Sequence, residues 1–334
     1  MAFAAIQGQE AALTFLRRAL ERGRIPGAFL FLGPHHVGKR GAALALAKAL
    51  NCEQPPDGPP DACDACPSCR KIDAAVHPDV VTVEPDGQFI KIDQVREVTD
   101  LLALNPALAR RRVVVLAEAE RMNPQAANAF LKTLEEPPAD TLIVLCADAG
   151  ARLPPTIVSR CVPVRFGPLP EPVLRALFSA AGKGAAPAGA TLDFAVRFAQ
   201  GRARPELREK FTAWLALRDD MLHLLGQGGG PGSLGDRPGK WAASGDWAFV
   251  LEWLETALRD LAWLAAGGGA GRLINVDRAD ALAALSAGLA PRAPERGLKA
   301  VLATRAALQL NANKTLALET LWTQMHQLCR RTAA

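Results

Sequence analysis

The sequence predicts a parallel α/β domain with a degenerate phosphate-binding loop, followed by an all-helical second half. Short apolar runs alternate with helical patterns over the first 166 residues, which is the order of elements that builds a parallel sheet. One of these runs is followed by a near match to the P-loop motif and then by an Ala/Leu-rich helix. From residue 167 onward, helical periodicity continues without a convincing strand.

The elements of the first half follow from the spacing of apolar residues. Uninterrupted apolar runs predict buried strands at residues 28–32, 80–83, 112–116 and 142–146. Apolar residues at helical spacing predict helices at residues 9–22, 41–50, 92–104 and 124–134. Asn123 is the expected cap of the last helix, and Pro124 suits its first turn.

The second half begins after a linker at residues 167–170. A short helical piece is expected to about residue 206, and longer amphipathic helices are expected at 247–264 and 315–328. The glycine-rich runs at 226–232 and 267–271 are predicted to be mobile loops. The tryptophans on these helices are expected to fill a core or a subunit contact, at positions 214, 247, 253, 263 and 322.

Composition restricts the class of protein. The chain has 334 residues, of which 49% are hydrophobic and 22% are charged, and this composition is typical of globular proteins. No apolar stretch is long enough to cross a membrane, and the first residues show no export signal, so we expect a cytoplasmic protein. A net charge of +5 neither requires nor opposes a nucleic-acid partner.

The phosphate-binding loop at residues 33–40 reads Gly-Pro-His-His-Val-Gly-Lys-Arg, whereas the motif ends in Ser or Thr. In this motif, backbone N–H groups cradle phosphates, the lysine reaches the outer phosphates, and the hydroxyl ligates Mg²⁺. Arg40 offers the metal no oxygen. The alternative is a glycine-containing turn without a ligand. The candidate phosphate-binding residues are Gly33, Pro34, Gly38 and Lys39.

The second magnesium contact is also missing from the sequence. P-loop ATPases carry an aspartate at the end of a hydrophobic strand, and here the strand at 112–116 is followed by Ala117 and Glu118. Because both oxygen donors are absent, Mg²⁺ is not expected and ATP binding is doubtful. We therefore expect no ATPase activity from this chain.

Four of the seven cysteines are bunched between residues 52 and 69, a spacing that favours a metal site in a cytoplasmic protein. Four thiolates suit tetrahedral Zn²⁺ and leave no open position, which predicts a structural zinc ion and argues against a zinc-dependent hydrolase. An iron–sulfur cluster is the competing interpretation. The predicted ligands are Cys52, Cys63, Cys66 and Cys69; Cys146, Cys161 and Cys329 are expected in the core.

Two further strings, ANAFLKTLEEPP at residues 127–138 and LPPTIVSRC at 153–161, are highly specific. With the loop and the cysteines, they make the chain resemble the clamp-loader subunits of bacterial DNA polymerase III, of the AAA+ class, over about residues 6–204. The resemblance implies a AAA+ domain at 1–167 with the zinc module at 52–69, a small helical lid at 168–206 and a helical collar at 207–334.

In that family the Ser-Arg-Cys motif presents its arginine to the ATP of a neighbouring subunit, and here the motif falls on Ser159, Arg160 and Cys161. A permanently charged, planar guanidinium is suited to the charge of a transferring phosphoryl group. An ordinary surface salt bridge is the alternative role for Arg160. His36 replaces a middle glycine that the family's loop often has, and Asp148 lies near the position of a phosphate-sensing threonine.

The resemblance implies a non-hydrolysing subunit of the polymerase holoenzyme, itself neither a polymerase nor an active ATPase. Its implied partners are the motor and delta subunits of the loader, the sliding clamp indirectly, and the backbone of primer–template DNA, with no membrane partner. Two alternatives remain open at this point: an ATP-hydrolysing motor subunit of the same loader, and a zinc-stabilised AAA+ scaffold without a role in replication.

Overall fold

The computed structural model describes residues 1–148, 153–180, 187–226 and 234–329. They form two compact units, the first comprising Met1–Leu174 with Gly201–Ala203, and the second comprising Arg175–Gln200 with the described residues from Arg204 onward. The division into three domains, with boundaries at 167 and 206, stays a prediction. Across the described residues, no helix combines the length and the apolar character needed to cross a membrane.

The first unit is built on a five-stranded sheet in the order β2-β3-β4-β1-β5, in which every neighbouring pair is parallel. The strands are β1 (Ala28–Leu32), β2 (Val80–Val83), β3 (Arg112–Leu116), β4 (Thr141–Ala147) and β5 (Val162–Arg165). The predicted parallel α/β class is confirmed. The first three strands have the predicted bounds, because strands covered on both faces are continuous apolar runs in the sequence.

Strand β5 was not predicted. It pairs only with β1, and its residues are exposed except for Val164, so its sequence lacks a continuous apolar run. Pro163 also argues against a strand, but proline is tolerated at a sheet edge, where its missing N–H removes no ladder bond.

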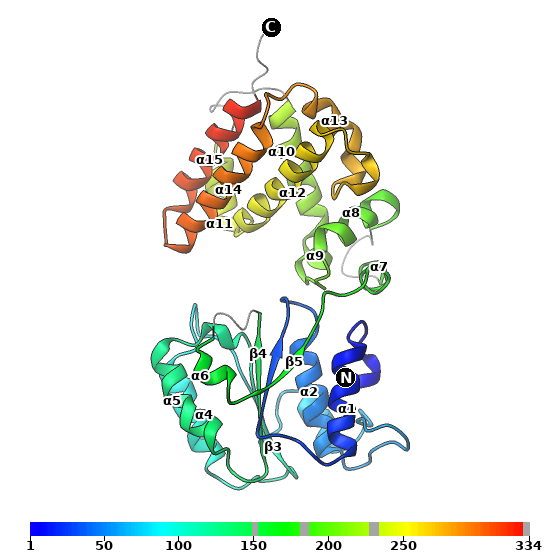
Figure 1. The fold of residues 1–334 in the computed structure, drawn as a ribbon, viewed down its shortest axis with the longest axis vertical. Coiled ribbons are helices and arrows are strands. Elements are labelled where there is room, and N and C mark those ends of the chain that lie inside the picture. The colour runs from blue at the N-terminus through cyan, green and yellow to red at the C-terminus, as the bar shows by residue number, and fades with distance from the viewer. Residues whose placement is uncertain (149–152, 181–186, 227–233, 330–334) are drawn as a thin grey trace. The chain divides into compact units, whose positions relative to one another are not determined.

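Helices cover both faces of this sheet (Figure 1). Helices α1 (Glu10–Glu21) and α2 (Lys39–Asn51) lie on one face, and α4 (Ile92–Leu102), α5 (Pro124–Glu135) and α6 (Pro155–Val158) lie on the other. The Asn123 side chain accepts a hydrogen bond from Ala126 N at 2.7 Å, which confirms the predicted cap of α5. In the described residues of this unit, the remaining helical segments are η1 (Phe3–Ala5), α3 (Pro67–Asp73) and η2 (Ala119–Arg121).

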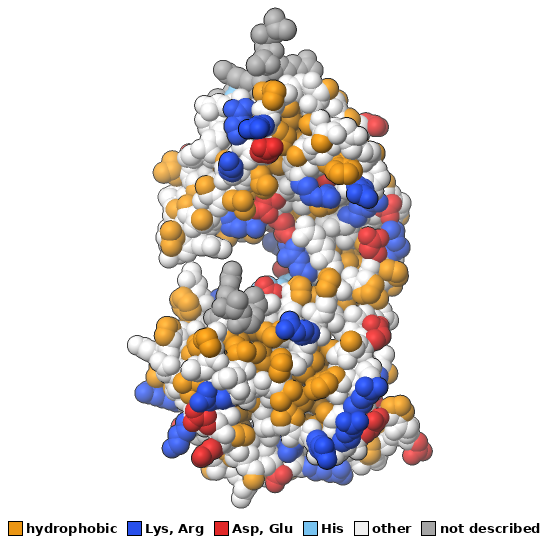
Figure 2. Space-filling model, in the orientation of Figure 1, with side chains coloured by type: hydrophobic (Ala, Val, Ile, Leu, Met, Phe, Trp, Pro, Cys, Tyr) orange, Lys and Arg blue, Asp and Glu red, His pale blue; other side chains and the backbone are white. Residues whose placement is uncertain are grey.

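The second unit contains only helices in its described residues, as predicted. They are α8 (Gly189–Ala199), α9 (Glu206–Glu209), α10 (Phe211–Gly226), α11 (Arg237–Ser244), α12 (Trp247–Ala265), η5 (Ala270–Arg272), η6 (Val276–Arg278), α13 (Ala279–Ser286), α14 (Ala293–Gln309) and α15 (Lys314–Cys329), while α7 (Glu171–Ser179) spans the unit boundary. Acidic and basic side chains are interspersed on the face of these helices that Figure 2 shows.

Aromatic side chains fill the core of the second unit. The Trp214 and Phe249 rings stack with centroids 4.5 Å apart, and the buried Trp253 donates from Nε1 to Asn275 at 2.9 Å. Trp214, Trp253 and Trp322 are buried, which confirms the core interpretation for these three. Most of the glycine-rich run at 226–232, and the side chain of Cys329, lie outside the described residues.

A buried ion pair, which the sequence analysis did not predict, joins the start of β2 to the start of β3 in the first unit. Asp79 is fully buried beside β2 and accepts hydrogen bonds from the backbone N–H groups of residues 107–109 at 2.7 to 2.9 Å. The guanidinium of Arg112, the first residue of β3, donates to the same carboxylate at 2.8 Å. Burial alone would raise the pKa of Asp79, but these donors lower it well below its usual range.

We expect Asp79→Asn to lower the free energy of unfolding by about 3–5 kcal/mol at neutral pH, because it leaves the buried Arg112 charge without its partner. Since folding depresses the pKa of Asp79, the native ion pair stabilises the fold above the unfolded pKa of about 3.9 and is lost as the pH falls toward the folded value. Urea unfolding at pH 7 and pH 3 measures both effects. The exposed Asp57→Asn serves as the control, and equal stabilities for the two variants would contradict the prediction.

Candidate functional site

The degenerate phosphate loop joins β1 to α2 in the strand–loop–helix arrangement that the motif requires. Gly33 leaves no room for a side chain, because a Cβ there would lie 2.2 Å from the Phe166 carbonyl oxygen. Gly38 caps α2 with a left-handed φ of 98°. His36 also adopts a left-handed φ, of 58°, which is unfavourable for a residue with a side chain. The loop thus joins β1 to α2 as the motif requires, but it carries the bulkier His36 where the related loops often have glycine.

The Lys39 side chain turns back onto its own loop. Its Nζ donates to the carbonyl oxygens of Gly33 and Pro34, the latter at 2.6 Å, and the residue is only 8% exposed. Burial lowers the pKa of the Lys39 ammonium, and the nearby Asp148 carboxylate opposes that shift. The structure therefore brings together Gly33, Pro34, Gly38 and Lys39, with the lysine engaged by the loop itself.

The two positions that would hold magnesium carry no oxygen donor in their side chains. Arg40, on the first turn of α2, forms an ion pair with Glu84, which follows β2. Ala117 follows β3 and donates its N–H to Val83 O at 2.9 Å. The next residue, Glu118, pairs with Arg121 at 2.9 Å.

Two carboxylates lie beside His35 of the loop, and the sequence analysis named only one of them, Asp148. His35 Nε2 lies 3.5 Å from Asp148 Oδ2 and 3.8 Å from Glu120 Oε1. The Glu120 side chain is 5% exposed, and it follows β3 by only a few residues. Both carboxylates favour the charged form of the Lys39 ammonium and oppose the effect of its burial on its pKa.

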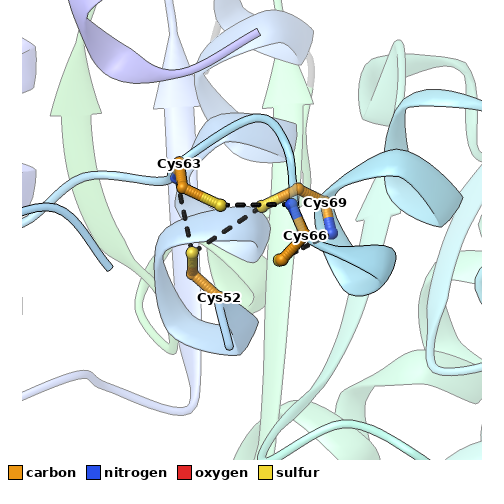
Figure 3. Close-up of side chains that lie close together, drawn as sticks. All are labelled: Cys52, Cys63, Cys66 and Cys69. Carbon is orange, nitrogen blue, oxygen red and sulfur yellow. Dashed lines mark hydrogen bonds between the residues drawn. The ribbon is translucent and has the colours of Figure 1, made fainter. Parts of the chain in front are cut away.

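The four predicted metal ligands form one cluster (Figure 3). Their Sγ atoms all lie within 4.8 Å of one another, and those of Cys52 and Cys69 are 3.8 Å apart. Sulfurs bound to one zinc ion at about 2.3 Å form a tetrahedron with edges of about 3.8 Å. Cys52 directly follows α2, whereas Cys66 caps α3 and Cys69 lies within it. The residues therefore fit a tetrahedral ion.

Backbone N–H groups point at these sulfurs and favour their thiolate forms. Cys66 N donates to Cys63 Sγ at 3.2 Å, and Cys69 N donates to Cys66 Sγ at 3.4 Å. Burial alone would raise the pKa of Cys66, but such N–H donors lower it to about 6. Burial and the neighbouring thiols raise the pKa of Cys69. A bound cation would offset this cost, since metal ligation requires deprotonated cysteines.

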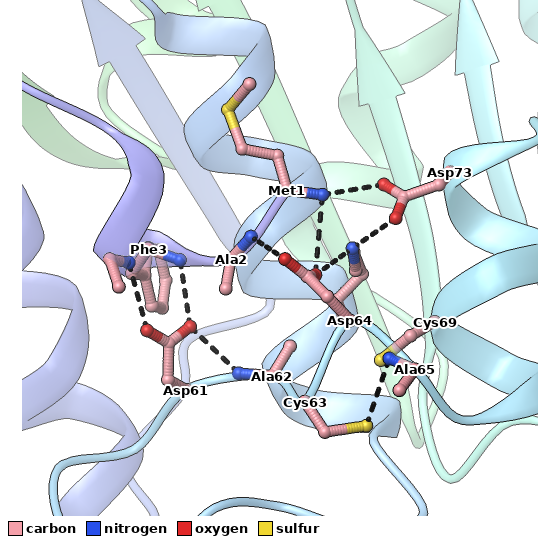
Figure 4. A network of polar contacts seen from close by, with 12 residues as sticks. Met1, Ala2, Phe3, Asp61, Ala62, Cys63, Asp64, Ala65, Cys69 and Asp73 are labelled. Carbon is pink, nitrogen blue, oxygen red and sulfur yellow. Dashed lines mark hydrogen bonds and ion pairs between the residues drawn. The ribbon is translucent and has the colours of Figure 1, made fainter.

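Acidic side chains anchor the cysteine module to the rest of the unit (Figure 4). Lys48 of α2 is fully buried and pairs with Asp64 and with Asp73, the latter at 2.6 Å. Asp64 follows the ligand Cys63 in the sequence, and its carboxylate also accepts a hydrogen bond from Ala2 N at 2.8 Å. Asp61 accepts from Phe3 N at 2.8 Å. These contacts, which the sequence did not reveal, hold the ligand loop in place against α2 and η1.

Arg160 lies between α6 and β5, 32% exposed, with the Ser159 hydroxyl beside it. Its guanidinium pairs with Glu135 at the end of α5. The adjoining Cys161 is buried in the core, as is Cys146 of β4, as predicted for both. The Ser-Arg-Cys motif thus places the Arg160 guanidinium at the surface, next to the buried side chain of Cys161.

Two family models match the chain. One is described as "DNA polymerase III, delta subunit" and matches residues 8–170; the other, "DNA polymerase III, delta subunit, C terminal", matches residues 242–327. Together they span more than half of the chain. The chain belongs to the DNA polymerase III delta-subunit family. The resemblance inferred from the sequence is confirmed.

This delta-family chain is similar to delta-prime subunits. It is 35% identical to that of Bacillus subtilis (strain 168) over 161 residues, 48% of either protein. It is 42% identical to that of Pseudomonas aeruginosa over 137 residues, 40% of this chain and 41% of that protein. It is also 38% identical to the tau subunit of Escherichia coli (strain K12) over 160 residues, 48% of this chain and 24% of that protein. The chain matches about half or less of the length of these relatives.

A solved structure shares the fold of this delta-family chain. The gamma subunit-related protein of Thermotoga maritima is 20% identical, with a TM-score of 0.50 over 95% of this chain and 99% of that one. Because delta-prime and tau subunits are both similar to this chain, similarity alone does not separate their roles, and the residues of the phosphate loop become the distinguishing feature.

Proposed function

We propose that this chain is the delta-prime, or stator, subunit of a clamp loader, which supports ATP-dependent loading of the sliding clamp onto primed DNA. Its own phosphate loop does not hydrolyse ATP, and Arg160 is lent to the ATP of a neighbouring motor subunit. The observation that carries the proposal is the combination in one chain of Arg40 and Ala117 with an intact Ser-Arg-Cys motif. A chain that cannot organise Mg²⁺–ATP can use such an arginine in phosphoryl transfer only at another subunit's site.

Several features of the structure support this role. The Lys39 ammonium is engaged by its own loop, and Arg40 pairs with Glu84 where the motif has a magnesium ligand.

The proposed partners are the motor and delta subunits, the clamp indirectly, and the backbone of primer–template DNA. Assembly is proposed to occur through the helical collar at residues 207–334. Within it, Asn313 accepts from Leu316 N at 3.0 Å and caps α15.

A structural zinc ion belongs to the same proposal. Cys52, Cys63, Cys66 and Cys69 would hold it, and all four positions of a tetrahedral ion would be filled by sulfur. When bound, the ion supplies a cross-link within the module and no reactive water. The residues around it anchor the module: Lys48 binds Asp64 and Asp73, so the ligand loop is joined to α2 by ion pairs as well as by Cys52.

The proposal predicts that the isolated chain shows no DNA-stimulated ATP hydrolysis above background, because neither magnesium position offers an oxygen. A steady-state phosphate-release assay with and without primed DNA measures this, with a Lys39→Ala variant as the control for contaminating ATPase. Turnover that depends on Lys39 would instead support the motor-subunit role, which the similarity to tau subunits also allows.

A further inference from the structure

The guanidinium of Arg160 is held on this chain by a defined set of acceptors. Its Nε donates to Glu135 Oε1 at 2.8 Å, and the terminal nitrogen Nη2 donates to the same oxygen. The other terminal nitrogen, Nη1, donates to Thr156 O at 2.9 Å and to Ser159 Oγ at 3.3 Å. The three guanidinium nitrogens are therefore all engaged within the first unit.

This arrangement leaves Arg160 little to offer another molecule. An arginine has five N–H donors in a fixed plane, and the edge formed by Nε and Nη2 is the one that grips a carboxylate or a phosphate in a forked manner. Here Glu135 occupies that edge. The pair is also electrically neutral, so the positive charge that would stabilise a phosphoryl group is largely offset.

We propose that Glu135 is a latch for Arg160: it holds the arginine against its own subunit, and the phosphate of a neighbouring subunit must displace it. This inference rests on the proposed function. Both side chains are partly exposed, Glu135 at 48% and Arg160 at 32%, so they can separate without unfolding the core. Exposed ion pairs are weak, which suits a contact that is exchanged when subunits assemble. Glu135 is thus a positioning residue, and it does not touch the nucleotide.

The test uses the reconstituted clamp loader with primed DNA and clamp, and measures ATP hydrolysis over a range of ATP concentrations. Glu135→Gln keeps the shape of the side chain but removes its charge. We expect kcat/KM for ATP at the adjoining motor site, read from single-turnover hydrolysis, to rise about two- to fivefold, mainly through a lower KM, since an exposed pair of this kind contributes a small competing energy. Glu136→Gln, a substitution of the exposed neighbour that takes no part in the bonds to Arg160, is expected to leave kcat/KM unchanged.

A double variant separates the latch from the function on which it rests. Because Glu135 acts through Arg160, adding Glu135→Gln to Arg160→Ala should cause no further change in kcat/KM for ATP. If Arg160→Ala slows the complex but Glu135→Gln leaves kcat/KM equal to or below that of the unmodified loader, the latch is wrong and the stator role stands. If Arg160→Ala has no effect, the lent arginine and its latch both fail. Gel filtration of each complex checks that assembly is intact.

Discussion

Arg160→Ala in the reconstituted clamp loader is expected to slow ATP hydrolysis at the adjoining motor site by about 10³-fold or more. Arginine fingers supplied from a neighbouring protein have effects of about 10³–10⁵ on the rate, because the guanidinium stabilises charge that develops on the transferring phosphoryl group. A motor site that Arg160 does not serve is unaffected by the substitution. The total steady-state rate should therefore fall partially, while single-turnover hydrolysis should lose one phase.

The matched control for this variant is Arg165→Ala. Arg165 is exposed on the edge strand β5, only five residues away, but it lies outside the Ser-Arg-Cys motif. A general effect of removing positive charge from this surface would slow both variants alike. Equal single-turnover traces for Arg160→Ala and the unmodified complex would show that Arg160 has no role in the neighbouring site.

Cys66→Ser is expected to abolish stable zinc binding and to destabilise the cysteine module. A structural zinc ion contributes about 10–16 kcal/mol of apparent binding energy in small zinc-binding peptides, and replacing one of four thiolates removes much of it. We expect the zinc content to fall from about one ion per chain to a small fraction, with a lower Tm and faster proteolysis of residues 53–65. Elemental analysis and limited proteolysis measure these effects.

Cys146→Ala provides the control, because Cys146 is a buried thiol of β4 outside the cluster. This variant should keep its zinc even if the core is somewhat less stable. Removal of the metal by a chelator should reproduce the behaviour of Cys66→Ser in the unmodified protein. A full complement of zinc in Cys66→Ser would refute the assignment of Cys66 as one of four ligands. Iron in place of zinc in the unmodified protein would favour the iron–sulfur interpretation.

Much of the first unit could be predicted from local sequence. Strands β1, β2 and β3 are uninterrupted apolar runs, and α5 carries its own start signal in Asn123 and Pro124. The cysteine cluster was also predictable, because two ligands at a spacing of three residues can turn onto one ion. Apart from Cys52, which is 11 residues before Cys63, these features depend on near neighbours in the chain, so a window of a few residues contains the information.

The features that escaped prediction depend on residues distant in sequence. Asp79 receives donors from residues 107–109 and from Arg112, and no pattern near Asp79 reveals them. The partner of Arg160 is Glu135, which is 25 residues earlier.

Helix α2 connects the loop to the cysteine cluster, and its length determines how the two can communicate. It starts at Lys39, ends at Asn51 and is 13 residues long, so at about 1.5 Å per residue its ends are separated by roughly 20 Å. An ion held at Cys52 is therefore far too distant to contact any group bound near Lys39. Loss of the metal could therefore affect the phosphate loop at the Lys39 end of α2 only by shifting or fraying the helix itself.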